Sequence, residues 1–208
     1  MSGAPSLAQL LCLPGSYLLG AIPSSYLLAR WMAGVDLRGF GSRNLGATNL
    51  YRLLGWKAAI PAGLFDLAKG AVPVFLAAGV PDAPQWWPLS IGVAAMLGHV
   101  YSPFVGFKGG KGVATAAGAF LALAPASIGV GAAVWLSVLL LSGYMSVASM
   151  TGAAAFAAAT PLLHPGRPVV AWAAAAAFAF IVFTHRSNVR RLRAGTESRF
   201  GKRKERST

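Results

Sequence analysis

The side chains best suited to chemistry gather in three polar segments rich in glycine. The first segment runs from Gly41 to Asn49 and is followed by Arg52. Glycine lets backbone N–H groups approach an anion closely, and Ser, Thr and Asn side chains donate hydrogen bonds. Arg52 lies one helical turn beyond Asn49, where a guanidinium could bind phosphate with two hydrogen bonds. The pattern indicates an anion site, although a capped helix start with a surface arginine would use the same residues. The candidate substrate contacts here are Gly41, Ser42, Asn44, Gly46, Thr48, Asn49 and Arg52.

The second segment, residues 106–115, precedes a predicted short helix and places two lysines among four glycines. A glycine loop that enters a helix N-terminus forms an anion site, and the lysines add positive charge. It is not a Walker A loop, because the spacing between glycine and GK is one residue short and Gly112 replaces Ser or Thr. A basic flexible loop at the membrane surface is the simpler alternative. The candidate substrate contacts are Lys108, Gly109, Gly110, Lys111, Gly112 and Thr115.

The third segment begins at the end of the last apolar stretch with His185 and Asn188 and continues to Glu197, which is a further candidate substrate contact. On a helix, His185 and Asn188 would share one face at i, i+3. A basic anchor at the membrane edge explains residues 190–206 better than a site does. For His185 and Asn188, the anchor and a functional role remain equal alternatives.

Three further polar residues lie within or beside apolar stretches. Asp66 and Lys69 are three residues apart inside the second stretch, where charges usually pair or line a polar cavity. A structural pair is at least as good an interpretation as a catalytic one. His99 is predicted to be a satisfied polar residue at a helix end rather than a direct participant, and His164 is predicted to lie in a loop without a role.

These segments must be positioned by helices that face something other than water. The chain has 208 residues, of which 56% are hydrophobic and 11% charged, against about a quarter charged in soluble domains. The formal net charge is +13, but the basic residues lie between and after apolar blocks. This placement favours membrane topology and anionic partners over nucleic acid. The single cysteine, Cys12, and five scattered acidic residues predict no disulfide, no metal site and no cofactor.

Seven apolar stretches are predicted to cross the membrane, so the fold class is an all-α polytopic membrane protein. A span needs roughly 20 apolar residues, although some of these stretches are shorter. The segment 113–161 is long enough for two ordinary or three short helices, and Pro125 and Ser142–Gly143 are the expected breaks. The seven predicted spans are Leu7–Met32, Trp56–Val80, Trp86–Val105, 113–124, 127–142, 144–160 and Val170–Thr184.

The basic residues predict the orientation of these spans. Basic side chains follow the first, third and last spans, whereas the connection around Asp82 has none. The positive-inside rule places the basic segments in the cytoplasm. They share that side only if the middle segment crosses three times, with the N-terminus outside and the C-terminus cytoplasmic. We expect one domain over residues 1–208, whose residues 186–208 form a basic cytoplasmic tail.

Three classes of protein remain open at this point. The polar segments suit an enzyme that orients two phosphate-bearing substrates and stabilises charge. The main alternative is a transporter or channel for organic phosphates, which would often show inverted repeats and polar groups at mid-depth. A third is an anionic-lipid anchor, which explains the basic tail but not the glycine-rich segments.

The motifs resemble those of the bacterial acyl-phosphate:glycerol-3-phosphate acyltransferases, the PlsY family. The resemblance rests on Gly41–Arg52, Asp66-x-x-Lys69-Gly70, Gly98-His99 leading to residues 106–115, and His185–Asn188 leading to Gly195–Glu197. It covers nearly the whole chain in the same order. Ala21 and Tyr101-Ser102 depart from the family's usual residues, and neither is one of the expected phosphate ligands.

The resemblance implies seven membrane helices with the active site on the cytoplasmic side of the bacterial inner membrane. It implies acyl transfer from acyl-phosphate to the 1-hydroxyl of sn-glycerol 3-phosphate, giving lysophosphatidic acid and inorganic phosphate. The family's key positions fall on Ser42, Arg52, Lys111, His185 and Asn188. Arg52 and Lys111 are then expected to bind phosphate, and Ser42 and Asn188 to hydrogen-bond and orient substrate. His185 is either a ligand contact or the proton acceptor, and the substrate's own phosphate is the alternative base.

The expected partners are these two substrates and membrane lipids. An enzyme that produces acyl-phosphate is a further candidate partner for the tail. The sequence leaves that contact, the oligomeric state and the acyl-chain preference open.

Overall fold

The computed structural model describes residues 7–81 and 83–201, and these residues form α-helices, one short 3₁₀ helix and no strand. The predicted connection through Asp82 and the end of the tail, residues 202–208, lie outside the described residues. The helices group into two compact units, one up to Ala122 and one from Leu123 onward. The all-α prediction is confirmed for the described part of the chain.

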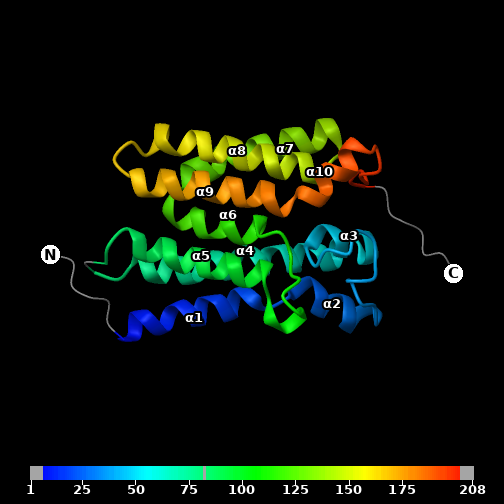
Figure 1. Cartoon of the computed structure of the whole chain (residues 1–208), viewed down its shortest axis with the longest axis horizontal. Helices are drawn as coiled ribbons and strands as arrows, with labels where there is room; N and C mark the ends of the chain where they lie inside the picture. The colour runs from blue at the N-terminus through cyan, green and yellow to red at the C-terminus, as the bar shows by residue number, and fades with distance from the viewer. Residues whose placement is uncertain (1–6, 82, 202–208) are drawn as a thin grey trace. The chain divides into compact units, whose positions relative to one another are not determined.

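The first unit contains six α-helices and the 3₁₀ helix η1, and its central element is α5. Helix α5 packs against both α1 and α4, while α4 also contacts α2 and α3 (Figure 1). Side chains of α5 such as Trp87, Ile91 and Ala95 are almost fully buried. The elements are α1 (Leu7–Ala21), α2 (Ser24–Ala33), α3 (Ala47–Leu54), α4 (Trp56–Ala78), α5 (Trp86–Val100), η1 (Pro103–Val105) and α6 (Val113–Leu123).

The first apolar stretch forms two helices rather than the single predicted one. Helix α1 ends at Ala21 and α2 begins at Ser24. Pro23 lies at the break; a proline has no N–H to donate and its ring collides with the carbonyl four residues earlier. At the break the Ile22 carbonyl accepts two hydrogen bonds, from the Ser24 N–H at 3.1 Å and from the Lys69 ammonium of α4 at 2.8 Å. The interruption is therefore stabilised from α4.

Close contacts between helices of the first unit depend on glycine. A Cβ atom at Gly98 of α5 would overlap the Tyr17 carbonyl of α1, and one at Gly118 of α6 would overlap the Leu67 carbonyl of α4. Small residues at helix interfaces let backbones approach closely, which is how membrane helices gain van der Waals contact. Helix α6 therefore packs against α4 through backbone rather than through large side chains.

The second unit is built from four helices: α7 (Pro125–Ser142), α8 (Met145–Leu163), α9 (Pro168–Thr184) and α10 (Arg186–Arg193). Helix α8 contacts both α7 and α9, and α10 contacts α9 (Figure 1). The predicted breaks at Pro125 and Ser142–Gly143 are confirmed: Pro125 opens α7, and Gly143 caps its end with φ of +70°. Helix α10 is bent by 54° from α9.

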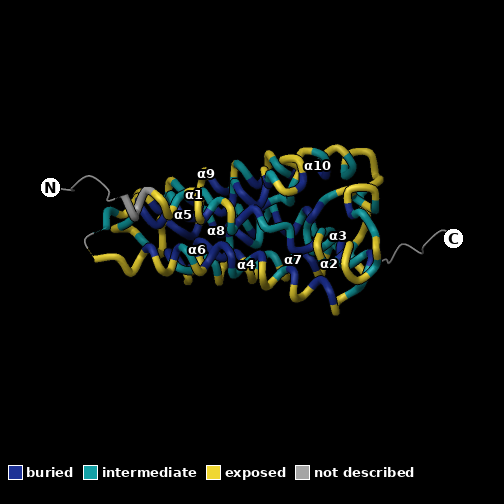
Figure 2. The backbone as a smooth tube through the Cα atoms, turned by 90° about the horizontal axis from the view of Figure 1, so that it is seen from below, coloured by how far each residue is buried: buried dark blue, intermediate teal, exposed yellow. Residues whose placement is uncertain are grey.

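Each of the seven predicted apolar stretches contains a helix in the described structure. Five are long and apolar enough to cross a membrane, and the bent pair of α9 and α10 adds a sixth. Helix α6 is apolar but has only 11 residues. Exposed positions along the helices, yellow in Figure 2, include large apolar side chains such as Leu141, Leu76 and Trp172. These properties fit a multi-pass membrane protein, while the count of seven and the orientation stay predictions.

The backbone contact of α6 gives a direct test of this packing. We expect Gly118→Ala to lower the melting temperature in detergent, because its methyl group meets the Leu67 carbonyl. Overpacking costs about 1–3 kcal/mol, and each kcal/mol lowers the Tm of a protein this size by about 2–4 °C. Gly129→Ala in α7 is the control, because nothing lies within 4 Å of a Cβ there. Equal melting temperatures for the two variants would show that α6 and α4 are not in backbone contact.

Candidate functional site

The first polar segment is organised by the side chain of Asn49, which is 1% exposed. Its Oδ1 accepts the Ser42 N–H at 3.1 Å, and its Nδ2 donates to the Phe40 carbonyl at 2.9 Å and the Leu37 carbonyl at 3.4 Å. Gly41 has φ of +58°, and a Cβ there would overlap Asn49 Oδ1. The amide of Asn49 thus holds the backbone that presents Ser42. Its polar atoms bind the loop, so its predicted contact with substrate has no support from this geometry.

The rest of this segment forms a turn that leads into α3. Asn44 Oδ1 accepts the Gly46 N–H at 3.1 Å, and Gly46 is the residue that precedes the helix. Thr48 lies in the first turn of α3 and Arg52 in the last turn, and both are partly buried. The short helix α3 therefore follows Ser42 in the chain and carries Arg52 in its last turn. The predicted anion site requires both residues.

The second polar segment contains the glycine loop, defined here as residues 106–112, which folds back onto the end of α5. Gly109 N–H donates to the Val100 carbonyl at 2.9 Å and Gly110 N–H to the His99 carbonyl at 3.1 Å. These bonds satisfy carbonyls that the end of α5 would otherwise leave unpaired. The two N–H groups expected to bind an anion therefore cap a helix.

The two cationic side chains of the glycine loop differ in exposure. Lys108 is exposed and Lys111 is partly buried, whereas Thr115 is fully buried in the first turn of α6. Contact of the two lysines with an anion stays a prediction that rests on their charge. A substrate contact by Thr115 stays a prediction.

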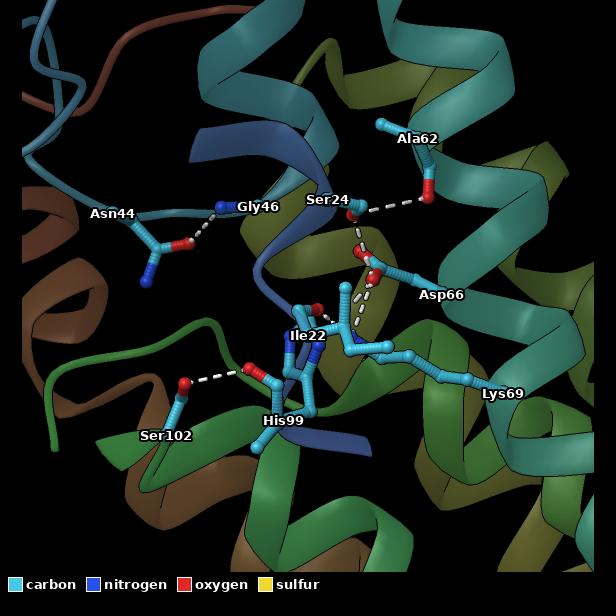
Figure 3. Close-up of polar contacts among 10 residues, drawn as sticks. Ile22, Ser24, Asn44, Gly46, Ala62, Asp66, Lys69, His99 and Ser102 are labelled. Atoms are coloured by element: carbon cyan, nitrogen blue, oxygen red, sulfur yellow. Dashed lines mark hydrogen bonds and ion pairs between the residues drawn. The ribbon is translucent and has the colours of Figure 1, made fainter. Parts of the chain in front are cut away.

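Beside the glycine loop lies a buried polar cluster that joins three helices, shown in Figure 3. Lys69 Nζ and Asp66 Oδ1 are 2.7 Å apart, and their side chains are 1% and 3% exposed. Asp66 Oδ1 also accepts the Ser24 hydroxyl at 2.9 Å and lies 3.6 Å from His99 Nδ1. With the bond from Lys69 to Ile22, every charged group of the cluster has partners. Of the two alternatives for Asp66 and Lys69, the geometry supports the structural pair.

In the second unit, His185 lies at the junction of α9 and α10 and is 2% exposed. Its Nδ1 lies 2.8 Å from the Ile181 carbonyl. A carbonyl only accepts hydrogen bonds, so Nδ1 carries the proton, and the lone pair of the neutral ring is on Nε2. This tautomer is the one a proton acceptor or a hydrogen-bond acceptor would need. The predicted i, i+3 face with Asn188 spans the bend between the two helices.

Glu197 ties the segment after α10 back to α8 and α10. It accepts hydrogen bonds from Asn188 Nδ2 at 2.6 Å, Ser146 Oγ at 2.9 Å and Arg191 Nε at 2.6 Å. Burial alone would raise the pKa of the Glu197 carboxyl, but the hydrogen bonds from Asn188, Arg191 and Ser146 outweigh it and hold the pKa below its ordinary value. These bonds support a structural role for Glu197, and its predicted contact with substrate stays a prediction.

The predicted site residues are divided between the two units. The first unit carries Ser42, Arg52 and the glycine loop, and the second carries His185, Asn188 and Glu197. Sequence reasoning missed the partners Ser24 and Ser146. Hydroxyl groups in otherwise apolar stretches were the available signal, because a buried polar group requires a hydrogen bond.

The apolar helices and the polar segments at their ends define an integral membrane protein of the multi-pass class. The particular family follows from comparison with known proteins. The family model described as glycerol-3-phosphate acyltransferase matches residues 10–195. The chain belongs to this family and is an acyltransferase of phospholipid synthesis.

Its relatives match nearly full length. The chain is 43% identical to the glycerol-3-phosphate acyltransferase of Geotalea daltonii over 193 residues, covering 93% of this chain and 98% of the relative. It is 45% identical to that of Thermus thermophilus over 201 residues, covering 91% of this chain and 94% of the relative.

Two solved structures share the fold. One is PlsY (YgiH), an integral membrane glycerol 3-phosphate acyltransferase, in its glycerol 3-phosphate form, with a TM-score of 0.87 and 39% identity. The other is its lysophosphatidic acid form, with a TM-score of 0.85 and 38% identity. Each comparison covers 93% of this chain and 96% of that protein.

The Glu197 network predicts a stability that depends on pH. The folded-state pKa of Glu197 lies below the ordinary value of 4.5, so its ionised form stabilises the fold. That contribution is complete above pH 4.5 and is lost as the pH falls through the lower folded-state pKa. We expect Glu197→Gln to melt earlier than wild type at neutral pH, with the difference shrinking as the pH falls below 4.5 toward the folded-state pKa.

The control for this measurement is Asp36→Asn, which also removes one carboxylate. Asp36 is ion-paired with Arg38 at 2.7 Å, but both side chains are exposed, where such pairs contribute little. A Glu197→Gln deficit of constant size across the pH range would show that the charge of Glu197 is not what stabilises the network.

Proposed function

We propose that this acyltransferase moves a fatty acyl group from acyl-phosphate to the 1-hydroxyl of sn-glycerol 3-phosphate. The hydroxyl oxygen attacks the acyl carbonyl carbon, and the bond from that carbon to the phosphate oxygen breaks. The products are 1-acylglycerol 3-phosphate, which is lysophosphatidic acid, and inorganic phosphate. Similarity to the glycerol 3-phosphate and lysophosphatidic acid forms of PlsY supports the acceptor and the product.

The observation that carries the choice of donor is the state of the carboxylates. Within residues 7–81 and 83–201, each acidic side chain is held in an ion pair: Asp36 with Arg38, Asp66 with Lys69 and Glu197 with Arg191. A carboxylate in such a pair is a poor general base. This arrangement suits a donor whose carbonyl is already activated, because acyl-phosphate has a good leaving group and needs no strong base.

The roles of the predicted residues follow from their chemistry. Arg52 and Lys111 bind the phosphate groups, and Lys111 also stabilises charge on the departing phosphate. Ser42, whose backbone is held by Asn49, and Asn188 donate hydrogen bonds that orient substrate. The proton of the attacking hydroxyl goes to the substrate's own phosphate, and His185 contacts ligand through Nε2.

We further propose that the protein resides in the bacterial inner membrane with its active site facing the cytoplasm. Lys108, Lys111 and the basic residues of α10 belong to the segments that the positive-inside rule assigns to that side. The N-terminus is then outside and residues 186–208 form a cytoplasmic tail of a single-domain enzyme. The acyl-phosphate-producing enzyme is the proposed partner of this tail.

The reaction is tested by phosphate release from palmitoyl-phosphate by purified protein, with and without glycerol 3-phosphate. We expect acceptor-dependent release with a lysophosphatidate product. Arg52→Ala and Lys111→Ala should each lose about 10- to 100-fold in kcat/KM, the scale of a charged hydrogen bond of about 1.5–3 kcal/mol. Lys57→Ala is the matched control, because Lys57 is exposed at the start of α4.

Other outcomes of this assay identify the alternatives. His185→Ala should raise KM, whereas a fall in kcat with normal substrate binding would make His185 the base. If well-folded protein shows no turnover but mediates glycerol 3-phosphate uptake into proteoliposomes, the protein is a transporter and not this enzyme.

The orientation is tested with single cysteines placed before α9 and after α10 in a Cys12→Ser background. Gly166 is exposed in the connection before α9, and Thr196 is exposed after α10. We expect Thr196→Cys to react with a membrane-impermeant maleimide only after the cells are opened, and Gly166→Cys to react in intact cells. The reverse pattern would place the basic tail outside.

A further inference from the structure

Against the backbone of the glycine loop lies a side chain that the proposed reaction does not use, the imidazole of His99. A Cβ atom added at Gly110 would overlap Nε2, Cε1 and Cδ2 of His99, so the ring lies directly beneath the backbone of Gly110. The same residue accepts the Gly110 N–H through its carbonyl at 3.1 Å. His99 therefore contacts the loop at Gly110, the residue before Lys111, through both its ring and its backbone carbonyl.

The other side of the imidazole faces the buried cluster. His99 Nδ1 lies 3.6 Å from Asp66 Oδ1, and that oxygen is held by Lys69 at 2.7 Å and by Ser24 at 2.9 Å (Figure 3). Asp66 and Lys69 belong to α4, and Ser24 to α2. His99 is only 9% exposed. The ring thus lies between Asp66 of α4 and the backbone of Gly110, and Ser24 connects Asp66 to α2.

We infer that His99 is a positioning residue, which sets the height of the glycine loop over α5 and thereby the position of Lys111. The inference rests on the proposed function, in which Lys111 binds substrate phosphate. Asp66 acts through His99 by holding its ring, so the buried ion pair serves the site as well as the fold. Displacement of a binding group by about 1 Å can cost on the order of 100-fold in rate.

Two neighbouring glycines provide a matched pair for the test. The methyl group of Gly110→Ala would meet only side-chain atoms of His99, whereas that of Gly109→Ala would meet the backbone carbonyls of His99 and Val100. Removing the His99 ring should therefore relieve the first substitution and leave the second unchanged. A double-mutant cycle isolates this coupling.

The measurement is the KM for glycerol 3-phosphate and for palmitoyl-phosphate, with kcat, in the wild type and in His99→Ala. We expect Gly110→Ala to lose on the order of 100-fold in kcat/KM in wild type, mainly through KM, and less than about threefold in His99→Ala. Gly109→Ala should lose the same factor in both backgrounds. Additive losses for Gly110→Ala and His99→Ala would overturn the inference.

A second variant and a second readout keep the test decisive. His99→Asn retains an N–H that can face Asp66 but lacks the ring beneath Gly110, so it should also relieve Gly110→Ala. If Gly110→Ala misfolds, recovery of its melting temperature and KM in the double variant supports the inference, and a failure to recover contradicts it. A loss of folded protein with unchanged KM would reduce His99 to a purely structural role.

Failure of the proposed donor is distinguishable from failure of this inference. Wild-type protein that does not turn over palmitoyl-phosphate would refute the donor. Equilibrium binding of radiolabelled glycerol 3-phosphate then reads out the same cycle, with coupling between His99 and Gly110 supporting the inference and additivity rejecting it.

Discussion

The bond from the Lys69 ammonium to the Ile22 carbonyl, together with its ion pair to Asp66, is the interaction on which the first unit depends. In hydrocarbon, an unpaired backbone carbonyl costs several kcal/mol, and so does an unpaired charge. The chain breaks a membrane helix at Pro23 and buries two charges in α4. The break supplies a backbone acceptor for the Lys69 ammonium, and the lysine adds a second donor, beside the Ser24 N–H, to the Ile22 carbonyl.

From this point the polar contacts spread to the elements that carry the candidate site. Asp66 reaches α2 through Ser24 and α5 through His99, and the end of α5 binds the glycine loop through its last carbonyls. The first polar segment has its own organiser in Asn49, which binds the backbone on both sides of Gly41. In this unit Ser42 and Lys111 thus lie on loops and Arg52 on α3, and buried hydrogen bonds determine where the two loops lie.

The sequence was sufficient to predict the structure wherever one residue type imposes a local backbone geometry or a local pairing. The breaks at Pro125 and Gly143 and the pairing of Asp66 with Lys69 at i, i+3 are local consequences of this kind. Contacts between segments that are distant in the chain could not be predicted from the sequence. Gly109 and Gly110 must be glycine because the end of α5 lies against their backbone, which only the folded structure shows. Likewise, Ser146 of α8, which donates to Glu197, is 51 residues away in the chain. Glycines that indicate anion binding in the sequence therefore serve close packing in the structure.

The shortness of α6 has a consequence for the lipid around it. Eleven residues make a helix of about 16 Å, roughly half the thickness of the hydrocarbon core. If it stands upright, either the bilayer thins beside it or one of its ends lies below the headgroups. If that end is the N-terminus, which follows the glycine loop directly, the loop lies at the depth where ester carbonyls meet acyl chains. In the proposed reaction, a water-soluble acceptor and a donor with an acyl chain would then meet there without either leaving its own phase.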